Sequence, residues 1–166
     1  HVIHSSHRTP EITFIDAVAS SSAAPMYFPP YETQSGSWMI DGGVVTNNPV
    51  LVGASHAKEF FKTDNIKILS IGAGLNKQKI SGETAGLWGG VGWLRNDLMG
   101  MMLDSEIHHT LAKDTLGKNY LRINSPIGKI NRILDDDSEL NIEKIHLMGL
   151  DWWSEFGEET LQFLKD

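Results

Sequence analysis

Asp41, Gly42 and Gly43 have the clearest potential for chemistry in this sequence. They follow the short apolar run 38–40, so the sequence predicts a strand that ends in a tight turn. Ligands of open α/β sheets bind beyond the carboxyl ends of strands, where a carboxylate can act as a general base. Two residues without side chains then let a substrate or another backbone segment approach closely. Asp-Gly is also an ordinary structural turn, so both interpretations start open.

The elements that must position this turn alternate between helices and strands. Thr9-Pro10 and Asn48-Pro49 each predict a helix start, and the first helix is expected to end before Pro25. The remaining expectations are a loop over 26–37, strands at 66–71 and 120–123, a helical region over 92–116 and a last helix over 141–164. This order predicts an α/β fold with a mostly parallel sheet. Because only about three strands are visible, we expect part of the sheet to be missing from this chain.

Composition excludes several classes of protein. The 166 residues suffice for one domain, and 40% hydrophobic residues suffice for a core. A net charge of -7 argues against nucleic-acid binding, and the lack of cysteine excludes disulfides and thiolate chemistry. No apolar run approaches the ~20 residues of a membrane span, and the N-terminus lacks a signal-peptide core. We expect a soluble protein, cytoplasmic or peripherally membrane-associated, whose chain begins inside a longer protein.

The histidines and the acidic run do not predict a metal site. None of the seven histidines occurs in a His-Glu-x-x-His pattern or another clear ligand spacing. His108 and His109 are adjacent, so on a helix they point in different directions. The run 135–139 lacks the glycine spacing of an EF-hand loop. We therefore expect no metal and no organic cofactor.

Five motifs occur in the order found in patatin-like phospholipases, and the resemblance spans nearly the whole chain. They are a Ser-Ala-Ala-Pro-x-Tyr-Phe helix end at 22–28, the Asp-Gly-Gly box at 41–43, Asn-Asn-Pro at 47–49, Ile-Gly-x-Gly at 71–74 and Tyr-Leu-Arg-Ile-Asn at 120–124. The resemblance implies a three-layer α/β/α acyl hydrolase with a Ser–Asp dyad. Asp41 then takes the proton of the serine directly, and Gly42 and Gly43 set its backbone geometry. The implied substrate is a lipid ester, most plausibly a glycerophospholipid.

The sequence departs from this family because the Gly-x-Ser-x-Gly nucleophile elbow and the glycine-rich oxyanion loop are absent. The nearest match, 53–57, ends in alanine and lies in a predicted helix, which argues against Ser55 as nucleophile. We therefore expect residues 1–166 to be the C-terminal portion of a single patatin-like domain. Alone it is expected to be inactive, and its open sheet edge is expected to require the N-terminal half or a second chain.

Two other functions stay open at this stage. One is a non-catalytic patatin-like interaction or regulatory module, and the other is a Ser–His–Asp esterase of a different fold. The segment 87–103, rich in Trp, Met and Gly, suits either an acyl-chain channel, a membrane-contacting flap or, as we favour, a helix packed in the core. Trp152, Trp153 and Phe156 on the last helix are also expected in the core.

Overall fold

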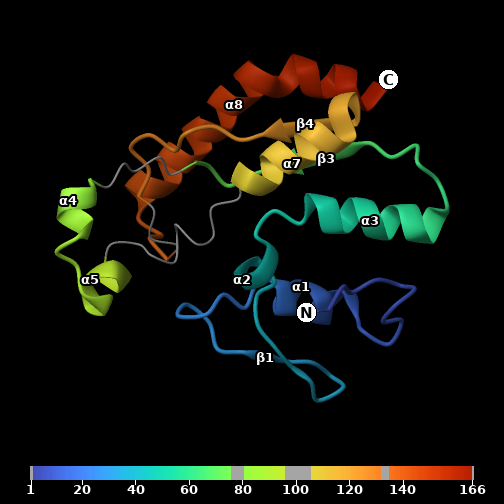
Figure 1. Ribbon diagram of the computed structural model, residues 1–166, viewed down its shortest axis with the longest axis horizontal. Helices are drawn as coiled ribbons and strands as arrows, with labels where there is room; N and C mark the ends of the chain where they lie inside the picture. Colours follow the sequence, from blue (N-terminus) through green and yellow to red (C-terminus); the bar gives the residue numbers. More distant parts are fainter. Residues whose placement is uncertain (1, 76–80, 96–105, 132–134, 166) are drawn as a thin grey trace.

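Two small sheets organise the chain in the computed structural model, which describes residues 2–75, 81–95, 106–131 and 135–165 (Figure 1). Strands β1 (Tyr31–Glu32) and β2 (Trp38–Met39) form an antiparallel hairpin. Strands β3 (Ile68–Ile71) and β4 (Tyr120–Ile123) pair in parallel, with Ile68 opposite Tyr120. The three predicted strands are thus confirmed, and the crossover from β3 to β4 is the one expected of an α/β fold.

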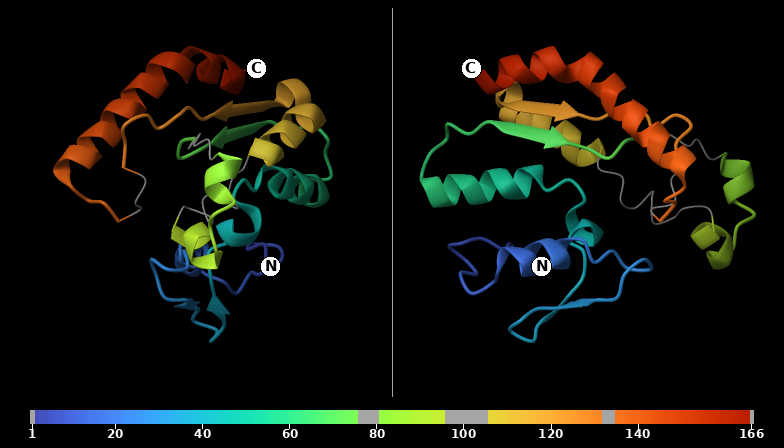
Figure 2. Two further views of the ribbon diagram at one scale, coloured as in Figure 1. Left: turned by 60° about the vertical axis from the view of Figure 1, so that its left-hand side comes forward. Right: turned by 180° about the vertical axis from the view of Figure 1, so that it is seen from behind.

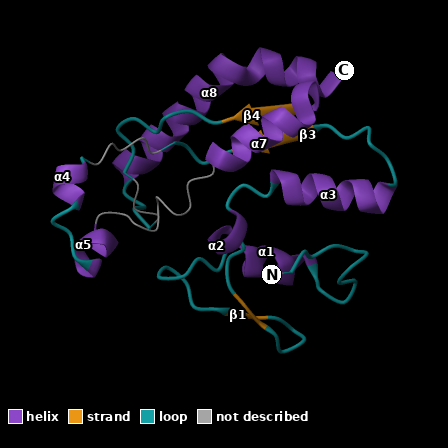
Figure 3. Cartoon of the chain, viewed as in Figure 1, coloured by secondary structure: helices purple, strands orange, loops and turns teal. Residues whose placement is uncertain are grey.

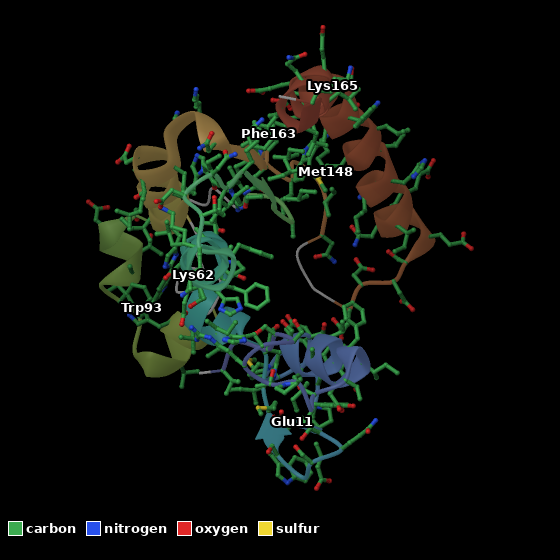
Figure 4. The ribbon with its side chains drawn as sticks, turned by 90° about the vertical axis from the view of Figure 1, so that its right-hand side faces the viewer. Glu11, Lys62, Trp93, Met148, Phe163 and Lys165 are labelled. Atoms are coloured by element: carbon green, nitrogen blue, oxygen red, sulfur yellow. The ribbon has the colours of Figure 1, made fainter. Side chains whose placement is uncertain are left out.

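Helices cover both faces of the β3–β4 pair. Helix α8 (Glu139–Lys165) lies on one side, and α3 (Val50–Phe61) and α7 (Glu106–Leu116) lie on the other (Figure 2). Val50, Ala112 and Tyr120 form the buried centre between α3, α7 and β4. Lys67, which precedes β3, connects the strand pair to α8, because its Nζ donates to the carbonyl oxygen of Phe163 at 3.0 Å. Figure 4 labels Phe163 on that helix. The α/β class is confirmed, with three layers around this parallel pair.

The first helix, α1 (Phe14–Ser21), begins later than the sequence predicted. Its N-cap is Thr13 and not Thr9: the Thr13 hydroxyl oxygen accepts from the Asp16 N–H at 3.0 Å, and the hydroxyl donates to the Asp16 carboxylate at 2.9 Å. The first bond satisfies a backbone N–H that has no partner within the helix, and the second orients the Asp16 side chain. The start at Asn48-Pro49 is confirmed, since α3 begins at Val50.

Asp16 also joins α1 to the β1–β2 hairpin. Its side chain is only 1% exposed, and the Tyr31 hydroxyl donates to Oδ1 at 2.9 Å. The backbone N–H of Gln34, in the hairpin turn, donates to the same oxygen at 3.4 Å. A buried carboxylate is costly unless it is hydrogen-bonded, so these donors account for its presence here.

Several short elements differ from expectation (Figure 3). Strand β1 lies in the predicted loop over 26–37, and α2 (Gly43–Thr46) follows directly where a turn was predicted. The region 92–116 holds α5 (Gly90–Arg95) and α7, while 96–105 lies outside the described residues. The other short elements are α4 (Gly82–Ala85) and the 3₁₀ turn Gly117–Asn119.

Large apolar side chains are more exposed than the sequence patterns predict. Ile71 in β3 is 68% exposed, and Trp153 on α8 is 59% exposed, so the prediction of a core position for Trp153 was wrong. Leu87 and Val91, in the segment expected to pack as a core helix, are 89% and 64% exposed. In the described part of the chain, each strand has a single partner. No helix among the described residues is both long enough and apolar enough to cross a membrane.

The Asp16 network predicts a specific loss of stability in acid. Burial raises the pKa of the Asp16 carboxyl, but hydrogen bonds from Tyr31, Thr13 and Gln34 outweigh burial and hold the pKa below its ordinary value of 3.8. The unfolded carboxyl titrates near that ordinary value. The stability that ionised Asp16 contributes is therefore complete above this pH and is lost as the pH falls toward the lower folded value.

We expect the free energy of unfolding, measured by urea denaturation at about pH 5 and about pH 3, to fall less in Asp16→Asn than in wild type. Glu59 and Asp136, whose pKa values are also lowered, contribute to both proteins, so the difference isolates Asp16. Equal losses in the two proteins would show that Asp16 has no lowered pKa.

Candidate active site

Asp41 lies just beyond β2, and the end of α1 holds its backbone. The Asp41 N–H donates to the carbonyl oxygen of Ala23 at 3.0 Å. Ala23 is 5% exposed and belongs to the segment that follows α1, so this bond joins two of the motifs that the sequence singled out. Buried backbone carbonyl groups need a hydrogen-bond partner, and the Asp41 N–H supplies one to Ala23. The side chain of Asp41 is partly buried.

The carboxylate of Asp41 closes a tight turn onto its own backbone. Its Oδ1 accepts a hydrogen bond from the Gly43 N–H at 2.7 Å, and its carbonyl oxygen accepts from the Val44 N–H at 3.3 Å. The chain then continues as the single helical turn α2. An aspartate that bonds a backbone N–H two residues on is the geometry of an Asx turn. The turn fixes the direction of the carboxylate.

The two glycines of the box have different structural roles. A Cβ placed on Gly43 meets Asp41 Oδ1 at 3.1 Å and Asn47 Oδ1 at 3.4 Å, so a side chain there crowds the carboxylate. Gly42 has a helical φ of -63°, which any residue adopts, and a Cβ there meets nothing within 4 Å. Gly43 therefore sets the geometry of the carboxylate, whereas Gly42 leaves open space beside it.

The Ile-Gly-x-Gly motif interlocks with the end of β4. The Gly72 N–H donates to the Ile123 carbonyl at 2.9 Å, and the Gly74 N–H donates to Asn124 Oδ1 at 2.9 Å. A side chain on Gly72 clashes with the Asn124 amide, and one on Gly74, where φ is +111°, clashes with Ile127. These glycines are therefore required by the packing of the two strand ends.

Ser55 lies within α3, as the sequence predicted, and its side chain is exposed. It is on a regular helix, without the strained strand-to-helix turn of a nucleophile elbow. It lines a shallow surface depression with Arg8 and His56. The geometry gives no reason to regard Ser55 as a nucleophile.

Four of the six histidines within the described residues contact a hydroxyl group or an aromatic ring, while Nδ1 of His108 is buried without a hydrogen-bond partner in that part of the chain. His109 Nδ1 lies 3.1 Å from the Tyr120 hydroxyl, and His4 Nδ1 lies 3.4 Å from the Thr9 hydroxyl. The rings of His7 and His56 pack against Phe60. Within the described ranges, no three His, Asp or Glu side chains gather in a way that could hold a metal ion.

The contrast between the two glycines gives a stability prediction. We expect Gly43→Ala to lower the free energy of unfolding by about 1–2 kcal/mol, because the added Cβ displaces the carboxylate from its bond with the backbone N–H. Gly42→Ala is the matched control, and we expect it to stay within about 0.5 kcal/mol of wild type. Urea denaturation measures both, and a larger loss for Gly42→Ala contradicts this assignment.

Comparison with known proteins agrees with these motifs. The family model described as patatin-like phospholipase matches residues 2–53, the segment that holds α1, the hairpin and the Asp-Gly-Gly box. The cGAMP-activated phospholipase of Vibrio cholerae is 32% identical over 142 residues, covering 73% of this chain and 39% of that protein. Patatin-like protein 4 of Arabidopsis thaliana is 32% identical over 168 residues, covering 81% of this chain and 42% of that protein.

Patatin-15 of Solanum tuberosum is similar over a comparable stretch, with 30% identity over 176 residues that cover 86% of this chain and 45% of that protein. The chain thus spans about two fifths of the length of these relatives. The matched segment, the order of the five motifs and the α/β architecture agree with one another, and the chain belongs to the patatin-like phospholipase family.

Proposed function

We propose that this chain supplies the general base, Asp41, to a lipid acyl hydrolase of the phospholipase A type. The observation that carries the proposal is the oriented carboxylate at the end of β2, within the segment that matches the family. The nucleophilic serine comes from residues outside this chain, and the chain alone is inactive. No metal or organic cofactor takes part in the proposed reaction.

The geometry of Asp41 suits proton transfer. The Gly43 N–H binds Oδ1, so Oδ2 is the oxygen available to a serine hydroxyl. A Cβ placed on Gly42 meets no atom of the described residues within 4 Å. The space beside Gly42 therefore leaves room for the serine-bearing segment or for the substrate. A general base must lie within hydrogen-bond reach of the proton that it takes, and the Asx turn holds the carboxylate ready for that approach.

The proposed reaction proceeds in two steps. The carboxylate of Asp41 takes the proton of the serine hydroxyl as the serine oxygen attacks the ester carbonyl, and the proton then passes to the departing alcohol. Backbone N–H donors outside this chain stabilise the oxyanion. In the second step, Asp41 takes a proton from water as the water oxygen attacks the acyl-enzyme. The ester bond to the serine then breaks, the fatty acid leaves, and the proton passes from Asp41 to the serine oxygen. Asp41 thus has the role that histidine has in a triad.

A glycerophospholipid is the proposed substrate, reached by peripheral contact with a membrane surface. The names of the relatives support a phospholipid, since the Vibrio cholerae protein is a phospholipase. Leu87, 89% exposed, and Phe28, 61% exposed, offer apolar side chains that can enter the interfacial region of a bilayer.

We further propose that residues 1–166 are the C-terminal portion of one patatin-like domain, completed by the N-terminal half or by a second chain. Support comes from the outer face of α1, where Phe14, Ile15 and Val18 are 85%, 71% and 50% exposed. It comes also from the parallel pair, which has unpaired outer edges in the described part of the chain. Exposed apolar faces and open edges of this kind are usually covered.

A non-catalytic interaction module is the second candidate, in which the complete protein keeps the fold but has no nucleophilic serine. A Ser–His–Asp esterase has less support, because four of the six described histidines contact Thr9, Phe60 or Tyr120. Neither candidate requires this carboxylate as the base that activates a serine, whereas the dyad proposal does.

Hydrolysis of a lipid ester by the complete protein separates these candidates. We expect Asp41→Asn to lower kcat by about a hundredfold or more, because asparagine keeps the size of the side chain but cannot take a proton. Ser55→Ala is the control for an alternative nucleophile and is expected to retain the wild-type rate within about twofold. Full activity of Asp41→Asn sinks the dyad proposal, and inactivity of the wild type on all lipid esters favours the interaction module.

A further inference from the structure

Asp16 is a buried carboxylate that the proposed reaction does not use. At 1% exposure it is the most buried large side chain among the described residues, and it sits between α1 and the hairpin. The Thr13 hydroxyl binds Oδ2, while the Tyr31 hydroxyl and the Gln34 N–H bind Oδ1. Its donors thus come from the start of α1, from β1 and from the hairpin turn.

We infer that Asp16 is a positioning residue for Asp41: it locks the β1–β2 hairpin onto α1 and so places the catalytic carboxylate. The inference rests on the proposed function, since it assumes that Asp41 is the base. Asp16 touches neither substrate nor reacting atoms in this account. It acts through the backbone that carries Asp41.

Two connections lead from Asp16 to Asp41. The first runs through the hairpin, because Tyr31 pairs with Met39, which stands two residues before Asp41. The second runs through α1, because the carbonyl oxygen of Ala23, beyond the end of that helix, accepts the hydrogen bond of the Asp41 N–H at 3.0 Å. A shift of the hairpin relative to α1 therefore moves Asp41 against Ala23 and strains that bond.

Apolar packing does not hold the two elements by itself. An open, largely apolar cleft of about 680 Å³ lies along α1 and the hairpin, and its lining includes Ala19, Ala23, Phe28, Tyr31 and Trp38. Side chains that border a cleft leave the relative position of their elements loosely determined. The directional hydrogen bonds at Asp16 determine it instead.

The carboxylate form of Asp16 matters for this geometry. It accepts hydrogen bonds from Thr13, Tyr31 and Gln34 at once, and an amide of the same size cannot do so because its nitrogen only donates. The ionised form is the one that these donors favour: they outweigh burial and lower the pKa of Asp16, and the Asp16 contact raises the pKa of Tyr31. The proposed reaction needs such geometry, because a displacement of about 1 Å can cost roughly a hundredfold in rate.

The test uses the complete protein and a chromogenic medium-chain fatty-acid ester. Asp16→Asn and Tyr31→Phe each weaken the hydrogen bonding between α1 and the hairpin. Tyr27→Phe is the matched control, since it makes the same change four residues before Tyr31 at a side chain that is 43% exposed. We expect kcat per folded molecule to fall about tenfold in Asp16→Asn and about threefold in Tyr31→Phe, with KM within about twofold. Tyr27→Phe keeps the wild-type kcat. Hydrogen exchange of the Asp41 N–H is expected to accelerate in the first two variants only.

Combining Asp16→Asn with Asp41→Asn decides how Asp16 acts. If Asp16 acts through Asp41, the double variant is no slower than Asp41→Asn alone. Asp41→Asn has already removed the base, so moving that position has no further effect on the rate. The inference is overturned if Asp16→Asn lowers kcat by the same factor in the wild-type and in the Asp41→Asn background. It is also overturned if Asp16→Asn lowers Tm but leaves kcat per folded molecule unchanged. Should Asp16→Asn fail to fold, Tyr31→Phe carries the same comparison. Full activity of Asp41→Asn by itself marks failure of the proposed function, and the inference falls with it.

Discussion

The hydrogen bond from the Asp41 N–H to the Ala23 carbonyl is the constraint on which the candidate site depends. It joins the first motif, residues 22–28, to the Asp-Gly-Gly box, and the whole β1–β2 hairpin lies between these two segments. The hairpin must therefore pack against α1 at a fixed place. The hydrogen bonds that Asp16 accepts from Tyr31 and Gln34 hold it there. Beyond the bond, the Gly43 N–H directs the carboxylate. Position and direction of the carboxylate thus have separate physical causes.

Much of the fold around the parallel pair could be predicted from the sequence, because its signals are local. The apolar runs of β3 and β4 and the Asn48-Pro49 helix start all appear where expected. The start of α1 was misplaced because Thr9-Pro10 and Thr13 both fit an N-cap, and only the Asp16 contacts of the folded chain decide between them. Exposure of Trp153 also escaped prediction, since a helix sequence alone does not say which of its apolar faces is covered.

The motif predicted the candidate site, but the sequence did not predict the residues that hold the site in place. Asp41 follows a short apolar run and an Asp-Gly pair, which are visible in the sequence, and the resemblance gave it a role. Asp16 offered only the Thr13-x-x-Asp16 pattern of a capping box, a signal for a helix start and not for a buried network. Strand β1 has two residues between a proline pair and a polar turn, too few for any periodicity. Contacts between Tyr31 and Asp16 arise only when the hairpin closes.

The central claim is that Asp41 takes the proton of a serine supplied from outside this chain. The most direct measurement is a crystal structure of the complete protein labelled with a fluorophosphonate, which bonds covalently to an activated serine. The account predicts a single labelled serine whose oxygen lies within hydrogen-bond reach of the Asp41 carboxylate, about 2.6–3.2 Å or one water away. A labelled serine beside a histidine and remote from Asp41 contradicts it, and so does a protein that takes up no label.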